Sequence, residues 1–257
     1  MNESVLMSEL SWNEYQRRII DEQQPVLLPV GAIEQHGPHL PLATDLLVVQ
    51  AIAEHTAKKV GGIVAPPLCY GYKSQCRSGG GNHFCGTTSL DADTLIKNIV
   101  DLAREFGRHG VRKLVMVDVH FENDMFVIEA SDLAIRELKR EGIDDFKILK
   151  PNMAAITNLE NIAQFYPEGF TSMSLEHAGK LETSVMLYLR PELVDIEKFP
   201  QDELAQIPPY DTFPPAIEHV PPSGVLCPVS GACREMGKIV FDDLVDGWVD
   251  AINVVFP

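Results

Sequence analysis

Residues 26–45 read VLLPVGAIEQHGPHLPLATD, an apolar run of strand length followed by a loop rich in glycine, proline and polar side chains. The run Val26–Val30 is apolar throughout, which is typical of a strand buried on both faces. The loop behind it carries Glu34, His36 and Asp45. Because ligands bind beyond the carboxyl ends of strands in open α/β sheets, this stretch predicts a buried strand with a polar site at its end.

Strands and helices are predicted to alternate along the chain. Apolar runs of strand length recur at residues 62–66, 113–119 and 146–149. Between them, apolar residues recur at steps of three and four from Leu95 to Phe106 and from Val127 to Leu138, which is typical of amphipathic helices. Parallel strands need long crossovers, usually helical, so the alternation predicts an α/β fold with a mostly parallel sheet flanked by helices.

Residues 199–228 contain eight prolines, a density that excludes a helix or a central strand. A helical period follows, with Phe241, Leu244, Trp248 and Ile252, and predicts a closing helix packed on the body. We therefore expect one domain over residues 1–257, with a proline-rich excursion at about 199–228.

Composition narrows the possible partners and the compartment. The 257 residues include 37 acidic and 21 basic side chains, and the formal charge of -16 argues against nucleic acid and membrane surfaces as partners. The five cysteines form no CxxC pair, which argues against a disulfide framework. The N-terminus has no basic and apolar leader pattern. These features predict a cytoplasmic protein.

A second polar cluster follows the predicted strand 113–119, where His120 and Glu122 stand. If this strand neighbours Val26–Val30, five groups of metal-ligand type converge at one edge of the sheet. Imidazole and carboxylate donors suit zinc or manganese, and three carboxylates with two histidines are enough for two ions when one carboxylate bridges them. The alternative interpretation of each segment alone is a hydrogen-bonded surface cluster.

The glycine-rich stretch 78–89, SGGGNHFCGTTS, lacks the spacing and the lysine of a phosphate-binding loop. Its glycines let the backbone approach a substrate, a neighbouring subunit or another loop closely. Ser78, Asn82 and His83 are candidate substrate contacts within it.

An acid and a histidine, Glu176 and His177, stand just before the predicted helix 182–189. Histidine titrates near neutral pH, so His177 is a candidate proton donor to a leaving group. The alternative is a capping cluster at the start of the helix.

Taken together, these motifs resemble the creatininase family over nearly the whole chain. The segments that carry the resemblance are LPVGAIEQHGPHLPLATD at 28–45, YGYKSQCRSGGGNHFCGTTSL at 70–90, HFENDM at 120–125, YPEGF at 166–170, LEHAGKLETS at 175–184 and PYDTFP at 209–214.

The resemblance implies a creatininase-type α/β fold, a homohexamer and two divalent metal ions per chain, zinc with zinc or manganese. It implies that Glu34 and His120 bind one ion, that His36 and Glu122 bind the other, and that Asp45 bridges them. It also implies a catalytic group of His177, Glu176 and Glu122, in which His177 protonates the leaving nitrogen and Glu176 supports it.

The sequence departs from this family at the predicted substrate pocket. Creatininase holds its flat substrate ring with two tryptophans, whereas the matching stretches here contain Met153 and Met173 and no tryptophan. Beside the metal ligands, Asp118-Val-His-Phe121 replaces the family's usual Asn-Gly-His-Tyr. Loss of aromatic stacking and of a hydroxyl reshapes the pocket, so we expect a small cyclic substrate other than creatinine.

Three functions are compatible with these residues. The first is hydrolysis of a C–N bond in a small cyclic amide. The second is ring opening of a carbocyclic keto-inositol, such as 3-dehydro-scyllo-inosose, at a C–C bond. The third is a metal-stabilised assembly protein without turnover.

The lining of the pocket discriminates between the two reactions. A polyol needs many hydrogen-bond partners, whereas a planar heterocycle needs an apolar slot. The candidate substrate contacts are Ser78, Asn82, His83, Asp118, Phe121, Met173 and Glu182.

Overall fold

A computed structural model describes residues 4–170, 172–201 and 204–257 of the chain. Its sheet has four parallel strands in the order β2-β1-β3-β4. They are β1 (Val26–Val30), β2 (Ile63–Val64), β3 (Lys113–Asp118) and β4 (Lys147–Leu149). The predicted α/β class is confirmed, although β2 and β4 are shorter than the apolar runs that predicted them.

Strands β1 and β3 are direct neighbours, with Val26 opposite Leu114 and Val30 opposite Asp118. Every residue of β1 is buried. Because parallel strands end at the same edge, the two loops that carry the predicted ligands leave the sheet side by side.

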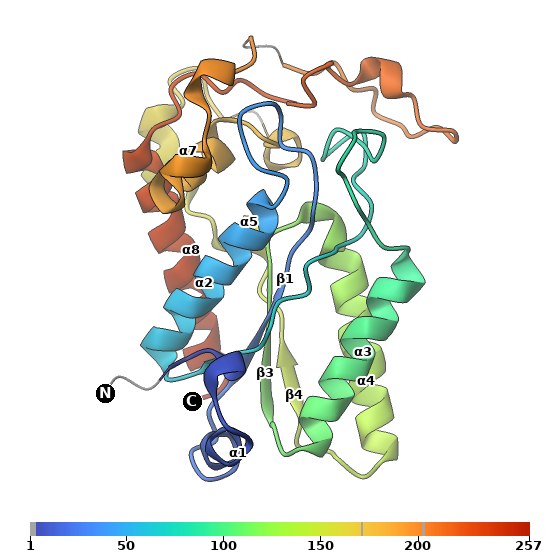
Figure 1. Cartoon of the computed structure of the whole chain (residues 1–257), viewed down its shortest axis with the longest axis vertical. Coiled ribbons are helices and arrows are strands. Elements are labelled where there is room, and N and C mark those ends of the chain that lie inside the picture. Colours follow the sequence, from blue (N-terminus) through green and yellow to red (C-terminus); the bar gives the residue numbers. More distant parts are fainter. Residues whose placement is uncertain (1–3, 171, 202–203) are drawn as a thin grey trace.

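Helices cover both faces of the sheet (Figure 1). Helices α3 (Ala92–Arg108) and α4 (Asp124–Arg140) lie on one face, and α2 (Thr44–Val60), α7 (Lys180–Leu189) and α8 (Arg234–Val255) lie on the other. The smaller elements are α1 (Trp12–Ile20), α5 (Met153–Ile156), α6 (Leu159–Ile162), η1 (Met7–Glu9), η2 (Phe121–Asn123), η3 (Ala163–Phe165), η4 (Met173–Leu175), η5 (Pro191–Leu193), η6 (Ile196–Lys198) and η7 (Ile217–His219).

The strand side chains alternate between two apolar cores. Leu27 and Val115 join the core under α2, α7 and α8, whereas Leu28 and Leu114 join the core under α3 and α4. This two-sided burial explains why the strands are continuous apolar runs. None of the described helices is long and apolar enough to cross a membrane.

Helix α8 packs unusually closely against α7. A Cβ added to Gly237 would lie 1.8 Å from the carbonyl oxygen of Ser184, so only glycine allows the two backbones this near. The contact brings Val240 and Leu244 of α8 toward the carboxyl edge of the sheet, where they line a cavity together with Val185 of α7.

The proline-rich segment 199–228 runs across the end of the molecule beyond the strands (Figure 1). Residues 202–203 of it lie outside the described part. Its return is tied to the body by a backbone hydrogen bond from Leu226 N to His177 O, and a bond from Ala205 N to Leu226 O joins its outgoing and returning parts.

Candidate metal centre

The predicted ligands converge at the carboxyl edge of the sheet. Glu34 and His36 lie in the loop after β1, His120 and Glu122 lie directly after β3, and Asp45 lies in the first turn of α2. Apart from the partly exposed Glu122, all are buried. The pairing of β1 with β3 is the reason that residues far apart in sequence meet here.

Asp45 lies between the two histidines. Its Oδ1 atom is 3.5 Å from Nε2 of His36, and its Oδ2 atom is 3.3 Å from Nδ1 of His120. The same Nδ1 atom is 3.1 Å from Oε2 of Glu34. These spacings are those of donor atoms that can share a cation.

Three groups of side chains offer donor atoms within 4.8 Å of one another. They are Glu34 with His120 and Glu122, His36 with Asp45 and Glu182, and Glu34 with His36 and His177. Glu122 thus lies with Glu34 and His120, and its assignment to the ion of His36 stays a prediction.

Three atoms at the centre have no hydrogen-bond partner among the described residues: Oε1 of Glu34, Nε2 of His36 and Oδ2 of Asp45. Orphaned buried acceptors of this kind are costly unless a cation satisfies them. Carboxylate oxygen with imidazole nitrogen is a donor set for zinc or manganese, so the residues fit divalent metal ions.

The outer hydrogen bonds of the histidines point their lone pairs inward. His36 Nδ1 lies 3.1 Å from the carbonyl oxygen of Glu34, and His120 Nε2 lies 3.2 Å from that of Tyr72. A carbonyl only accepts, so each of these nitrogens carries the proton and donates it. The opposite nitrogen of each ring is then free for a metal ion, the arrangement found around metal-binding histidines.

The electrostatics show competition between a proton and a cation for these nitrogens. Burial lowers the pKa of His36, but the carboxylates around it, Asp45 first, outweigh burial and raise the pKa to about 10. For Asp45 the effects are reversed: burial raises the pKa of this carboxyl group, but His36 and His120 outweigh burial and hold that pKa well below its usual range. A metal ion would replace the histidine protons as the positive charge that the carboxylates need.

Glu122 is held by the glycine-rich loop and by Gln75 just before it. Its Oε1 atom accepts hydrogen bonds from the Ser78 hydroxyl at 2.6 Å and from the backbone N–H of Gln75 at 3.1 Å. The structure therefore brings Ser78 into the site, as the motif suggested.

His177 and Glu176 lie at the same edge, just before α7. The His177 ring is buried, with its centroid 4.6 Å from that of His36, and its Nε2 atom is 2.9 Å from the carbonyl oxygen of Gln35. Burial, and then the nearby His36, lower the pKa of His177, which keeps the ring neutral. Glu176 accepts hydrogen bonds from the Cys227 thiol at 3.0 Å and from the Leu181 backbone N–H.

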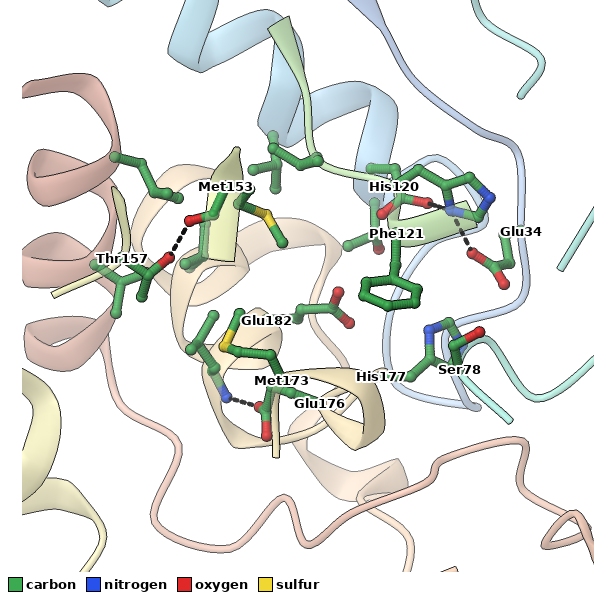
Figure 2. Close-up of a pocket in the computed structure, with 18 of the residues that line it drawn as sticks. Glu34, Ser78, His120, Phe121, Met153, Thr157, Met173, Glu176, His177 and Glu182 are labelled. Atoms are coloured by element: carbon green, nitrogen blue, oxygen red, sulfur yellow. Dashed lines mark hydrogen bonds and ion pairs between the residues drawn. The ribbon is translucent and has the colours of Figure 1, made fainter. Parts of the chain in front are cut away.

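A cavity opens from these groups toward α5, α7 and α8. In Figure 2 the Phe121 ring lies between Ser78 and His177 on one side and Met153 and Thr157 on the other. Of the predicted substrate contacts, the residues that line this cavity are Ser78, Phe121, Met173 and Glu182. Much of the remaining wall is aliphatic, from Val48, Val119, Leu181, Val185, Val240 and Leu244.

The structure places three other predicted substrate contacts outside this lining. Asn82 is exposed and accepts a hydrogen bond from Ser89. His83 is exposed beside the ring of Phe84. Asp118 is buried beneath the loop after β3, where its Oδ1 atom accepts from the backbone N–H of His120 and from Asn123. A short acid at a strand end satisfies the donors of the following loop and does not reach the cavity.

Sequence reasoning missed other residues of this site. Gln35 contacts His177, and Cys227 contacts Glu176. Val240 and Leu244 line the cavity from the last helix. No local pattern marks them, because each reaches the site only through contacts between distant parts of the chain.

Comparison with known proteins places this geometry among hydrolases. The family model Creatininase (creatinine amidohydrolase) matches residues 8–252. A creatinine amidohydrolase of Pseudomonas putida is 45% identical over 258 residues, which cover 100% of this chain and 99% of that protein.

More distant relatives carry other activities in their names. A mycofactocin precursor peptide peptidase of Mycobacterium ulcerans (strain Agy99) is 31% identical, covering 88% of this chain and 84% of that protein. A 3-dehydro-scyllo-inosose hydrolase of Thermotoga maritima is 29% identical, covering 67% of this chain and 52% of that protein.

Solved creatininase structures have the same fold. A mutant creatininase of the Zn-Zn type superimposes with a TM-score of 0.96 at 44% identity, covering 100% of both chains. A creatininase described as the Mn form gives a TM-score of 0.96 at 44% identity, covering 99% of this chain and 100% of that one.

Proposed function

This chain belongs to the creatininase family of hydrolases, and from that premise we propose that it uses two divalent metal ions to open a small cyclic amide at a C–N bond. The observation that carries the proposal is the position of Asp45, whose two oxygens face two different histidines and which lines a cavity. Because the chain belongs to a hydrolase family, we favour an enzyme over the third function considered above, an assembly protein without turnover.

Five residues would hold the two ions. The family resemblance assigns one ion to Glu34 and His120, the other to His36 and Glu122, and the bridge to Asp45. Zinc in both sites, or zinc with manganese, suits these donors and agrees with the Zn-Zn and Mn forms of related creatininases. When bound, the ions would lower the pKa of water and stabilise the oxygen anion that develops on the substrate.

The chain's own residues move the proton and hold the geometry. His177 is neutral, buried and in ring contact with His36, so its free ring nitrogen could accept the proton that the attacking water loses and then give that proton to the leaving nitrogen. Glu176, fixed by the Cys227 thiol and the Leu181 N–H, supports the segment that carries His177. Ser78 and the Gln75 N–H keep the Glu122 carboxylate at the edge of the site.

The walls of the cavity support a planar heterocycle as the substrate. Only Ser78 and Glu182 of the five polar candidates line it, whereas Met153 and Met173 contribute flexible apolar surface. Phe121 is 53% exposed and presents a ring without a hydroxyl group. Creatinine would lack both indole contacts here, so we propose a different cyclic amide as the preferred substrate.

A second candidate is the hydrolytic ring opening of a keto-inositol. Ser78 and Glu182 supply hydrogen-bonding groups beside the proposed metal ions, and the Thermotoga relative bears the name of that activity. The valine and leucine side chains of the cavity weigh against a polyol, because they offer a hydroxyl group no partner.

The function is tested by assaying ring opening of creatinine, other cyclic amides such as hydantoins and lactams, and keto-inositols. The protein is used as purified, after chelation, and after reloading with zinc or manganese. Metal-dependent opening of a cyclic amide supports the first candidate, and exclusive opening of a keto-inositol selects the second. Absence of metal-dependent turnover on every class would refute both.

Three broader features belong to the same proposal. We propose a single catalytic domain that includes the proline-rich excursion, a homohexameric assembly and a cytoplasmic location. The assembly rests on the family resemblance, and the location rests on the acidic charge and the cysteine usage.

A further inference from the structure

Gln35 is an uncharged residue that stands between two proposed metal ligands, Glu34 and His36, in the loop after β1. Its side chain is 5% exposed, so its amide must find hydrogen-bond partners inside the protein. It has no charge to offer a metal ion, which separates its role from that of its neighbours.

The Gln35 amide joins three segments of the chain. Its Nε2 atom donates to the carbonyl oxygens of Gly79 at 3.0 Å and Gly224 at 2.8 Å, and its Oε1 atom accepts from the backbone N–H of Gly37 at 2.9 Å. Both N–H bonds are therefore occupied, and the partners fix which end of the amide is nitrogen. The segments joined are the ligand loop, the glycine-rich loop and the end of the proline-rich excursion.

Two glycines allow these loops to close on the amide. A Cβ at Gly80 would lie 2.6 Å from Nε2 of Gln35, and a Cβ at Gly224 would lie 2.1 Å from its Oε1. Both glycines also have φ of +77°, a conformation that side chains disfavour. The glycine-rich loop thus approaches Gln35 closely, where the sequence had left open a substrate, a subunit or another loop.

The contacts with Gln35 indicate which nitrogen of the His177 ring carries the hydrogen. Nε2 of His177 lies 2.9 Å from both the backbone oxygen and the side-chain nitrogen of Gln35. The side-chain nitrogen has no hydrogen left to give, and the carbonyl oxygen only accepts, so Nε2 of His177 carries the hydrogen and donates it to that oxygen. The lone pair of the neutral ring is then on Nδ1.

We propose that Gln35 is a positioning residue for His177. By tying three loops together through its amide, it fixes the position of its own carbonyl oxygen, which in turn holds the His177 ring with Nδ1 as the nitrogen that exchanges protons with the reacting groups. The inference rests on the proposed function, in which His177 moves the proton, and it adds a residue that binds neither metal nor substrate.

The test removes the amide and follows kinetics, metal content and the ring itself. In Gln35→Met, we expect kcat to fall about 100-fold with KM within about threefold, because misplacement of a catalytic group by about 1 Å has that effect. Metal content should match that of the unmodified protein. In zinc-loaded protein labelled with ¹⁵N-histidine, the His177 Nε2–H resonance, assigned by its loss in His177→Ala, should broaden or disappear.

Matched variants separate this role from general damage. Gln50→Met removes a glutamine that bonds Glu54 on the surface of α2, and it should leave kcat unchanged. Gly224→Ala displaces the Gln35 amide from the other loop and should lower kcat alone, whereas Gly142→Ala, with φ of +83° and no atom within 4 Å, should not. The Gly224 variant carries the test if Gln35→Met does not accumulate as folded protein.

If a folded Gln35→Met or Gly224→Ala protein had the same kcat as the unmodified protein, the proposal would be overturned. So would a loss of kcat that tracks a loss of bound metal, since Gln35 would then act through its neighbouring ligands. If the unmodified protein opened no ring at all, the proposed function would fail, but the ¹⁵N-histidine resonance would still show whether Gln35 holds the His177 ring.

Discussion

The Oδ2 atom of Asp45 lies 3.3 Å from Nδ1 of His120, so the first turn of α2 meets the end of β3 across the site. Both side chains are buried, with exposed fractions of 5% for Asp45 and 2% for His120. Since the second oxygen of Asp45 faces His36 at 3.5 Å, this one carboxylate has a position for a cation on each side. The proposed two-metal chemistry depends on that geometry.

Replacing Asp45 by asparagine should therefore lower metal content and activity together. Loss of an outer partner of a ligand already costs about 10- to 100-fold, so we expect kcat/KM to fall at least about 100-fold. Metal is measured by elemental analysis after gel filtration. Asp246→Asn, at an exposed residue that pairs with Lys59, is the control and should retain both properties. Full metal content with full activity in Asp45→Asn would contradict the bridging role.

Removal of metal should destabilise the fold as well as abolish turnover. The carboxylates of Glu34 and Asp45 are buried, and a cation present at about 100 times its Kd adds about 2.7 kcal/mol to the free energy of unfolding. For a chain of this size that corresponds to a rise in Tm of about 5 to 10 °C. Chelation followed by addition of zinc or manganese, monitored by calorimetry, measures it. Asp45→Asn should show a smaller response, and an identical Tm in all states would refute metal binding at this centre.

Met173→Trp should improve the use of creatinine. An aromatic face at this wall adds stacking of about 0.5 to 1.5 kcal/mol, which corresponds to a gain of about 2- to 10-fold in kcat/KM. Met125→Trp places the same side chain at a residue that is 67% exposed and outside the cavity, and it should change nothing. If a folded Met173→Trp protein showed no gain on creatinine, the absence of an indole ring at this wall would not explain the substrate specificity.

The two tryptophans should differ sharply in their effect on stability. Trp248 is fully buried, and its Nε1 atom lies 3.3 Å from the Met116 carbonyl oxygen, to which it donates. Trp248→Ala should lower the free energy of unfolding by about 3 to 5 kcal/mol. Trp12 is 79% exposed, and Trp12→Ala should change it by less than about 0.5 kcal/mol. Urea unfolding measures both, and equal losses would contradict the packing of α8 on the sheet.

The burial of Tyr15 should make the free energy of unfolding fall at alkaline pH. Its hydroxyl group is buried without a hydrogen-bond partner among the described residues, and burial raises its pKa to about 12 from an ordinary 10. The unfolded chain therefore loses this proton first, and stability falls as the pH rises from 10 to 12. Two pKa units set an upper limit of about 2.7 kcal/mol.

Tyr15→Phe should remove this step and leave stability at pH 8 unchanged or slightly higher, because it deletes an unsatisfied polar group. Urea unfolding of both proteins at pH 8, 10 and 11.5 gives the comparison. A parallel decline in the two proteins would show that Tyr15 is not the titrating group.

The sequence predicted the framework well because that framework depends on local patterns. The run Val26–Val30 coincides with β1, and the closing helix follows its predicted period. The weaker predictions concern strand ends, since pairing with a neighbour limits β2 to Ile63–Val64 within the longer apolar run.

Parts of the site could not be predicted because they depend on which side chains meet across the fold. Asp118 and Glu182 are both acids beside a motif, yet Glu182 lines the cavity whereas Asp118 bonds the backbone of the His120 loop. Gln35 gave no signal, because its partners are carbonyl oxygens of Gly79 and Gly224 from two distant loops. Every residue has a backbone carbonyl group, so the sequence does not mark which carbonyl will accept a hydrogen bond.

The close contact of Gly237 with Ser184 has an evolutionary consequence. It makes α8 a wall of the cavity, so the aliphatic surface of the cavity comes largely from the C-terminal half of the chain, whereas the proposed metal ligands all precede residue 123. Substitutions at Val185, Val240 or Leu244 can change which molecules fit while the residues that perform hydrolysis stay the same. Relatives that share the same metal-ligand motif can in this way diverge in substrate specificity through substitutions in their last helices alone.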